Sequence, residues 1–136
     1  MKIFICTNDA ELRSTLESIA NDYASMEQFS ISLGLSTGSP LELLDYVKDI
    51  SPEKSLYILD VDTKDEVDGI LMAAKIREQN QRSKIVLLSI YPHLSQLAIM
   101  HGIEALDYID RNRSECMQYL VKKSIETAHS RLNAAS

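Results

Sequence analysis

The sequence predicts an α/β fold in which helices cover both faces of a parallel β-sheet. Short apolar runs alternate five times with amphipathic segments of helical spacing, and this alternation is the pattern of a doubly wound sheet. The chain has 136 residues, of which 45% are hydrophobic, which is enough for one domain with its own core. We therefore expect residues 1–136 to form a single domain.

The first two strand–helix pairs precede residue 51. Residues 2–6 form an apolar strand, and the apolar residues that follow at spacings of four, three and four predict a helix. Asn8 and Glu11 resemble the capping box of that helix. Residues 29–33 alternate between polar and apolar as an edge strand does. A serine N-cap and a proline at the first helical position then predict a helix over 40–50.

Three further pairs complete the predicted sheet. Their strands are expected at 56–60, 84–88 and 105–109. The helix after the third strand is expected over 68–79, the next is short and ends at Gly102, and the last has a long apolar face. Right-handed crossovers and this number of strands favour the flavodoxin-like (βα)5 arrangement with strand order 2-1-3-4-5.

That strand order brings the tips of four strands together at one edge of the sheet. The tips carry polar residues, namely Thr7, Asn8 and Asp9, then Asp60, Ser89 and Arg111. Ligands and phosphoryl groups bind at this edge of open α/β sheets, because strand ends and helix N-termini meet in one crevice. Asp60 is therefore the first candidate for chemistry, and the alternative is that its carboxylate only caps the following loop.

Composition and motifs argue against several classes of function. The 14 Lys and Arg and 20 Asp and Glu give a net charge of −6, which argues against a broad nucleic-acid-binding face. No apolar stretch approaches the roughly 18 residues of a membrane-spanning helix, so we expect no membrane contact and a cytoplasmic location. An enzyme that binds flavin or a nucleotide is not expected, because no glycine-rich phosphate loop follows a strand and no nucleophile is paired with a base.

Four features of the sequence match a known family. They are the opening segment 1–6, the eight-residue gap from Asp60 to Asp68, the segment 105–108 and the closing segment 126–132. On these features the chain resembles the receiver domain of two-component response regulators. More narrowly it is similar to the accessory-gene-regulator type, whose members carry a LytTR DNA-binding domain after the receiver and answer peptide quorum signals.

The resemblance implies that Asp60 is the phosphoacceptor of a sensor histidine kinase. Ser89 stands at the family's hydroxyl position, Arg111 replaces the family's lysine, and Tyr108 matches the aromatic residue that changes rotamer on activation. The resemblance also implies a homodimer through the fourth helix, fifth strand and fifth helix. DNA binding and transcription control are expected from a C-terminal effector domain of the full-length protein that is absent from residues 1–136.

The resemblance further implies a Mg²⁺ ion beside Asp60, with Asn8 and Asp62 as the other candidate ligands. In the family an acidic pair after the first strand helps to hold this ion, but here neutral Thr7 and Asn8 stand in its place. The usual charge of about −2 around the metal then falls to near neutral, which removes most of the Coulombic attraction for a divalent cation.

The arginine at position 111 leaves two hypotheses open. A guanidinium can pair with a carboxylate through two hydrogen bonds, so in the first hypothesis Asp60 and Arg111 form a salt bridge at rest and phosphorylation is weak or absent. In the second, Arg111 binds the phosphoryl oxygens and Asn8 lends an oxygen to a loosely held Mg²⁺.

Plainer roles also remain open for three of these residues. Ser89 can cap the helix that follows it, Asn8 can act only as a helix cap, and Tyr108 can be an ordinary packing residue of its strand. A third class of function is an interaction module that dimerises through the predicted face without any chemistry.

Overall fold

The computed structural model describes residues 1–27, 30–49, 54–62, 68–91 and 94–134. Its sheet is five-stranded with the order β2-β1-β3-β4-β5, and each neighbouring pair is parallel. The strands are β1 (Lys2–Cys6), β2 (Ser32–Thr37), β3 (Ser55–Asp60), β4 (Lys84–Ser89) and β5 (Asp107–Asp110). The predicted flavodoxin-like fold class and strand order are thereby confirmed.

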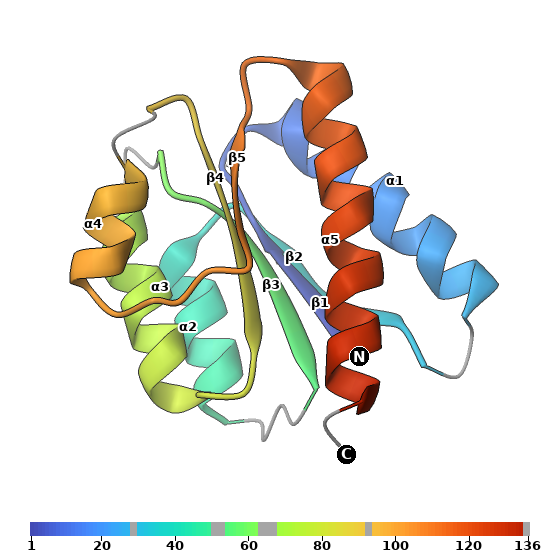
Figure 1. The fold of residues 1–136 in the computed structure, drawn as a ribbon, viewed down its shortest axis with the longest axis horizontal. Coiled ribbons are helices and arrows are strands. Elements are labelled where there is room, and N and C mark those ends of the chain that lie inside the picture. The colour runs from blue at the N-terminus through green and yellow to red at the C-terminus, as the bar shows by residue number, and fades with distance from the viewer. Residues whose placement is uncertain (28–29, 50–53, 63–67, 92–93, 135–136) are drawn as a thin grey trace.

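Five helices in the described ranges cover the sheet. They are α1 (Ala10–Met26), α2 (Pro40–Lys48), α3 (Gly69–Gln79), α4 (Leu94–Met100) and α5 (Ser114–Ala134). Helices α1 and α5 lie on one face, and α2, α3 and α4 lie on the other (Figure 1). None of the helices in the described part of the chain is both long enough and apolar enough to cross a membrane.

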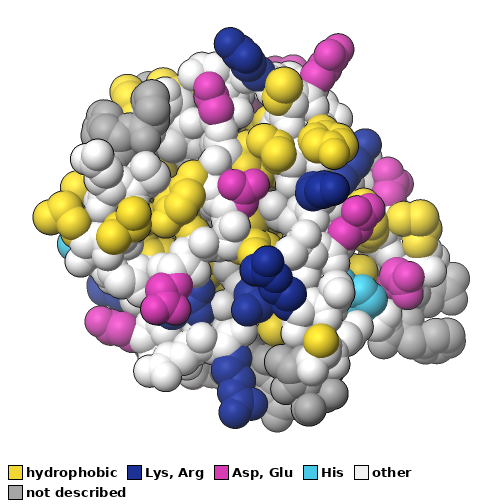
Figure 2. Space-filling view, viewed as in Figure 1, with side chains coloured by type: hydrophobic (Ala, Val, Ile, Leu, Met, Phe, Trp, Pro, Cys, Tyr) yellow, Lys and Arg dark blue, Asp and Glu magenta, His cyan; other side chains and the backbone are white. Residues whose placement is uncertain are grey.

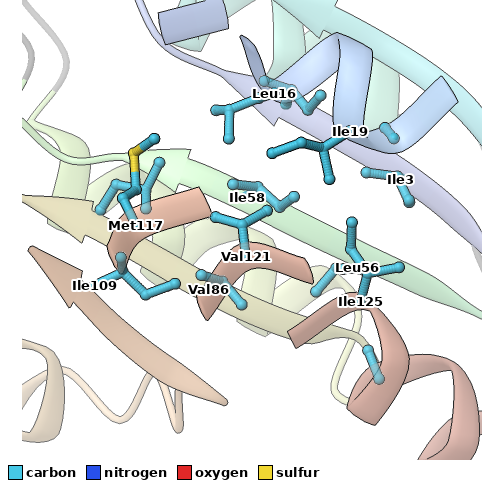
Figure 3. Packing of buried hydrophobic residues seen from close by; sticks show 14 of the residues in the cluster. Ile3, Leu16, Ile19, Leu56, Ile58, Val86, Ile109, Met117, Val121 and Ile125 are labelled. Atoms are coloured by element: carbon cyan, nitrogen blue, oxygen red, sulfur yellow. The ribbon is translucent and has the colours of Figure 1, made fainter. Parts of the chain in front are cut away.

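Each face of the sheet has its own hydrophobic core. On the α1 and α5 side, Ile58 and Val86 of the sheet meet Leu16, Val121 and Ile125 of the two helices (Figure 3). On the opposite side, β-strand residues pack against α2, α3 and α4. All six residues of β3 are buried, as expected for a central strand of a parallel sheet with helices on both faces.

The predicted second strand and first helix cap need correction. Strand β2 runs from Ser32 to Thr37 and not over 29–33 as expected, and residue 29 lies outside the described residues. A Cβ on Gly34 of this strand would come within 2.8 Å of the Phe4 ring, so packing against β1 favours glycine there. The N-cap of α1 is Asp9, not Asn8, since the Asp9 side chain accepts the backbone N–H groups of the first turn.

Gly69 explains the Asp-Gly pair at the start of α3. Asp68 is the N-cap, and its carboxylate accepts the N–H of Ile70 at 2.8 Å. A Cβ on Gly69 would lie 2.5 Å from the Cα and carbonyl oxygen of Val61, which no side chain can tolerate. The glycine therefore lets the start of α3 approach the backbone that follows β3, next to Asp60.

Arg77 of α3 joins two turns at the opposite end of the sheet. Its guanidinium donates to five backbone carbonyls, those of Asn80, Gln81, Ser83, Ile103 and Glu104. One of these turns contains Glu104, which has a positive φ of 53°. Burial lowers the pKa of the Arg77 guanidinium, and the charge of Glu104 partly opposes this.

We expect Arg77→Ala to lower the free energy of unfolding by about 2–4 kcal/mol, because several half-buried carbonyls lose a charged donor. Urea unfolding followed by circular dichroism measures this loss. Arg82, an exposed arginine close by in the turn after α3, supplies the matched control, and Arg82→Ala should change the free energy by no more than about 0.5 kcal/mol. Equal losses in the two variants would contradict the assigned role of Arg77.

Candidate functional site

Asp60 ends the central strand β3 with its carboxylate enclosed by protein. The residue is 1% exposed. Thr7, directly after β1, donates its hydroxyl to Asp60 Oδ2 at 2.7 Å, and the backbone N–H of Asp62 donates to Oδ1 at 3.0 Å. Strands β1 and β3 are neighbours in the sheet, so the topology brings Thr7 to this carboxylate.

Arg111 supplies the positive charge of the site. Its guanidinium forms a salt bridge with Asp60 Oδ2 and lies 3.5 Å from Asp9 Oδ2. Its backbone N–H donates to the carbonyl of Ser89 at 3.2 Å, so the chain after β5 stays beside β4 while the side chain reaches across to β3. The resting salt bridge of the first hypothesis is therefore present in the structure.

Opposing effects act on the ionisation of Asp60. Burial raises the pKa of its carboxyl, because a charged carboxylate is poorly solvated there. The Thr7 hydroxyl, the Asp62 N–H and the charge of Arg111 all lower the pKa, and the Asp62 carboxylate raises it. The pKa lies above the usual value of an aspartate, so the ionised form of Asp60 depends on its three donors.

Asp62 turns toward the tip of β4 and binds two donors there. The Ser89 hydroxyl donates to Asp62 Oδ1 at 2.8 Å, and the N–H of Ile90 donates to Oδ2 at 2.7 Å. Ser89 Oγ also accepts the N–H of Tyr91 at 2.9 Å. Ser89 thus reaches the predicted edge of the sheet, and the shorter hydrogen bond of its hydroxyl goes to Asp62.

The predicted metal ligands Asn8, Asp60 and Asp62 have different surroundings. Asn8 is exposed, Asp62 is engaged with the tip of β4, and Asp60 Oδ2 already faces a hydroxyl donor and a guanidinium cation. No group of three His, Cys, Asp or Glu residues with metal-binding geometry exists in the described ranges. The donor set around Asp60 therefore does not fit Mg²⁺, since two of its members are themselves positive or hydrogen-donating.

Two contributors to the site were not assigned these roles from the sequence. From the sequence, Thr7 was placed where the family has an acidic residue, and Asp9 was named only as a polar residue at the tip of the first strand. Thr7 is 1% exposed and also accepts the N–H of Asp9 at 3.2 Å. The available signal was position alone, because both residues follow β1 directly and β1 is adjacent to β3.

Tyr108 lies on β5, which neighbours β4 and not β3, and is 38% exposed. With Ser89, Ile90 and Tyr91 it lines a cavity of about 400 Å³ between the ends of β4 and β5 and the start of α4. The structure therefore brings Ser89 and Tyr108 to one cavity, while Asp60 and Arg111 lie together beside it.

We compared the chain with protein families and with known proteins. No family model matches the sequence. The chain is similar to accessory gene regulator protein A of Staphylococcus epidermidis, with 29% identity over 136 residues, which are 100% of this chain and 57% of that protein. The chain thus spans little more than half the length of the curated relatives it matches.

The solved structures with the same fold include response regulator receiver domains. A CheY-like receiver domain protein from Methanospirillum hungatei superposes with a TM-score of 0.78 at 12% identity, covering 99% of this chain and 98% of that chain. TrrA from Thermotoga maritima, in complex with Mg²⁺-BeF, has a TM-score of 0.68 at 19% identity, covering 93% and 97%. The predicted resemblance is therefore confirmed: the chain has the fold of a response regulator receiver domain and is related over its whole length to accessory gene regulator protein A.

Proposed function

We propose that this receiver domain takes a phosphoryl group on Asp60 from a phosphohistidine of a sensor kinase. The observation that supports this most is the carboxylate at the tip of β3, whose oxygens accept hydrogen bonds from Thr7 and Asp62 and pair with Arg111. These three donors supply positive charge and hydrogen bonds where anionic oxygens would gather. Stabilisation of this kind is the main need of phosphoryl transfer.

The transfer itself uses the lone pair of an Asp60 oxygen. That oxygen attacks phosphorus, the phosphorus–nitrogen bond of the phosphohistidine breaks, and its electron pair stays on the imidazole nitrogen. Asp60 becomes an aspartyl phosphate that carries about two negative charges. Arg111 has to leave Asp60 Oδ2 before the attack, and the nearby Asp9 carboxylate offers it an alternative partner.

After the transfer, Arg111 stabilises the aspartyl phosphate and no longer the free Asp60 carboxylate. A guanidinium binds two phosphoryl oxygens at once, so Arg111 can return to the new anion and neutralise part of it. In this proposal the Arg111 guanidinium neutralises the charge that a metal ion would otherwise neutralise, and no step requires a bound Mg²⁺. The hydrogen bond from the Asp62 backbone N–H to Asp60 Oδ1 keeps the carboxylate oriented throughout.

Signal output is proposed to pass through α4, β5 and α5. Exposed apolar side chains lie on these elements, including Leu97, Ile99 and Met100 of α4, Tyr108 of β5 and Tyr119 of α5. Figure 2 shows hydrophobic side chains gathered over α4. We propose that a second copy pairs with this face, that Ser89 and Tyr108 couple it to Asp60, and that a DNA-binding domain in a longer cytoplasmic protein reads the change.

A phosphorylation-independent dimerisation module is the second candidate. The observation that favours it is the closed state of Asp60, which is 1% exposed and paired with Arg111. In that case Arg111 stays paired with Asp60, and no phosphoryl group is added. Labelling of Asp60 distinguishes the two functions.

Incubation with acetyl phosphate, read by intact mass, should add one phosphoryl group to the wild-type chain. Asp60→Asn should take up none, because the nucleophilic carboxylate is gone. A metal chelator should leave the wild-type rate within about a factor of three, since Arg111 rather than Mg²⁺ neutralises the product. Asp110→Asn, at the exposed tip of β5, is the matched control and should label normally. An unlabelled wild type would favour the dimerisation module.

Arg111→Gln should move the titration of the Asp60 carboxyl to higher pH, because it removes a charge that lowers that pKa. In the wild type the pKa is already raised, so the stability contributed by neutral Asp60 is complete below its unfolded pKa and is lost as pH rises through the folded pKa. In Arg111→Gln this loss extends to higher pH.

Carbon-13 NMR of the Asp60 carboxyl against pH measures this shift, with Asp60→Asn to assign the signal. The matched control is Arg113→Gln, which removes an exposed arginine two residues away. An Asp60 titration at the same pH in wild type and Arg111→Gln would show that the ion pair does not control this carboxyl.

A further inference from the structure

We propose that the Asp62 carboxylate is an internal anionic ligand that occupies the two β4-tip donors a phosphoryl group on Asp60 would otherwise take. Ser89 and Ile90 provide these donors, and Asp62 binds both in the resting chain. The competition for them rests on the proposed phosphorylation of Asp60. The two hydrogen bonds that Asp62 accepts from Ser89 and Ile90 at rest, which we call the latch, do not depend on that phosphorylation.

The latch follows from the geometry of two neighbouring strands. Asp60 pairs in register with Leu88, and the N–H of Val61 donates to the carbonyl of Leu88 at 3.0 Å. The next residue on β4 is Ser89, so its hydroxyl and the N–H after it face the chain just beyond Asp60. Asp62 stands there and accepts both, at 2.8 Å and 2.7 Å.

Charge makes the two anions rivals. At rest the site holds the carboxylates of Asp9, Asp60 and Asp62, and of these the Arg111 guanidinium pairs with Asp9 and Asp60 but not with Asp62. Phosphorylation of Asp60 adds about one further negative charge, and like charges a few ångströms apart repel strongly where solvent is scarce. A phosphoryl group therefore gains most when Asp62 turns out to solvent and releases Ser89 and Ile90.

The latch also fixes a surface. Ser89 Oγ accepts the N–H of Tyr91, so Asp62, Ser89 and Tyr91 form one hydrogen-bonded chain. Ser89, Ile90 and Tyr91 line the cavity that also contains Tyr108. Replacement of Asp62 by a phosphoryl group would shift Ser89, Ile90 and Tyr91. Asp62 therefore sets the resting position of these three residues.

Amide hydrogen exchange of Ile90 tests the latch without any phosphodonor. In Asp62→Ala the Ile90 N–H should exchange at least about tenfold faster than in wild type, because a charged acceptor is lost. Asp62→Asn keeps one acceptor oxygen and should accelerate the exchange less. Asp110→Ala is the matched control, since Asp110 accepts the N–H of Asn112, and it should leave Ile90 unchanged. Unchanged Ile90 exchange in Asp62→Ala would overturn the latch.

Acetyl phosphate labelling of the same variants tests the competition. Asp62→Ala should label Asp60 about tenfold faster than wild type, because one repelling charge is removed. Equal rates in a chain that labels normally would overturn the competition for the donors. If neither wild type nor Asp62→Ala labels, the proposed phosphorylation of Asp60 fails, while the Ile90 exchange still decides the latch.

Discussion

The buried ion pair of Asp60 and Arg111 is the interaction on which the rest of the site depends. Asp60 is 1% exposed, and a carboxylate removed from water is stable only when charge and hydrogen bonds compensate it. Thr7, the Asp62 N–H and Arg111 provide that compensation from three different segments. The strand order 2-1-3-4-5 is what brings these segments to one carboxylate.

The same pair changes the electrostatic design relative to a metal-dependent site. A guanidinium brings one positive charge on a tethered side chain, whereas a divalent ion brings two and must be captured from solution. Thr7 fits the arrangement because a hydroxyl donates to the carboxylate, where an acidic residue would repel it. Asp9 holds the far side of Arg111, so the arginine has a partner on either side.

Periodicity and turn residues were sufficient to predict the fold, because buried parallel strands and amphipathic helices leave clear patterns. The Asp60–Arg111 pair was also predictable, since strand order places both residues at one edge. Three features were not. Asn and Asp cap helices about equally well, so the cap at Asp9 was assigned one residue early. The bounds of β2 were misplaced because polar–apolar alternation alone does not fix where an edge strand begins and ends. The direction of Asp62 depends on donors of β4 that only the folded chain supplies.

The central claim is that Arg111, and not a metal, balances the charge of Asp60. A Mg²⁺ titration followed by backbone amide NMR tests it most directly, with Thr7, Asp62 and Arg111 as reporters. The account predicts no saturable shifts of these amides through millimolar Mg²⁺, because a cation already faces the carboxylate. Saturable shifts centred on these three amides, with millimolar or tighter affinity, would contradict it.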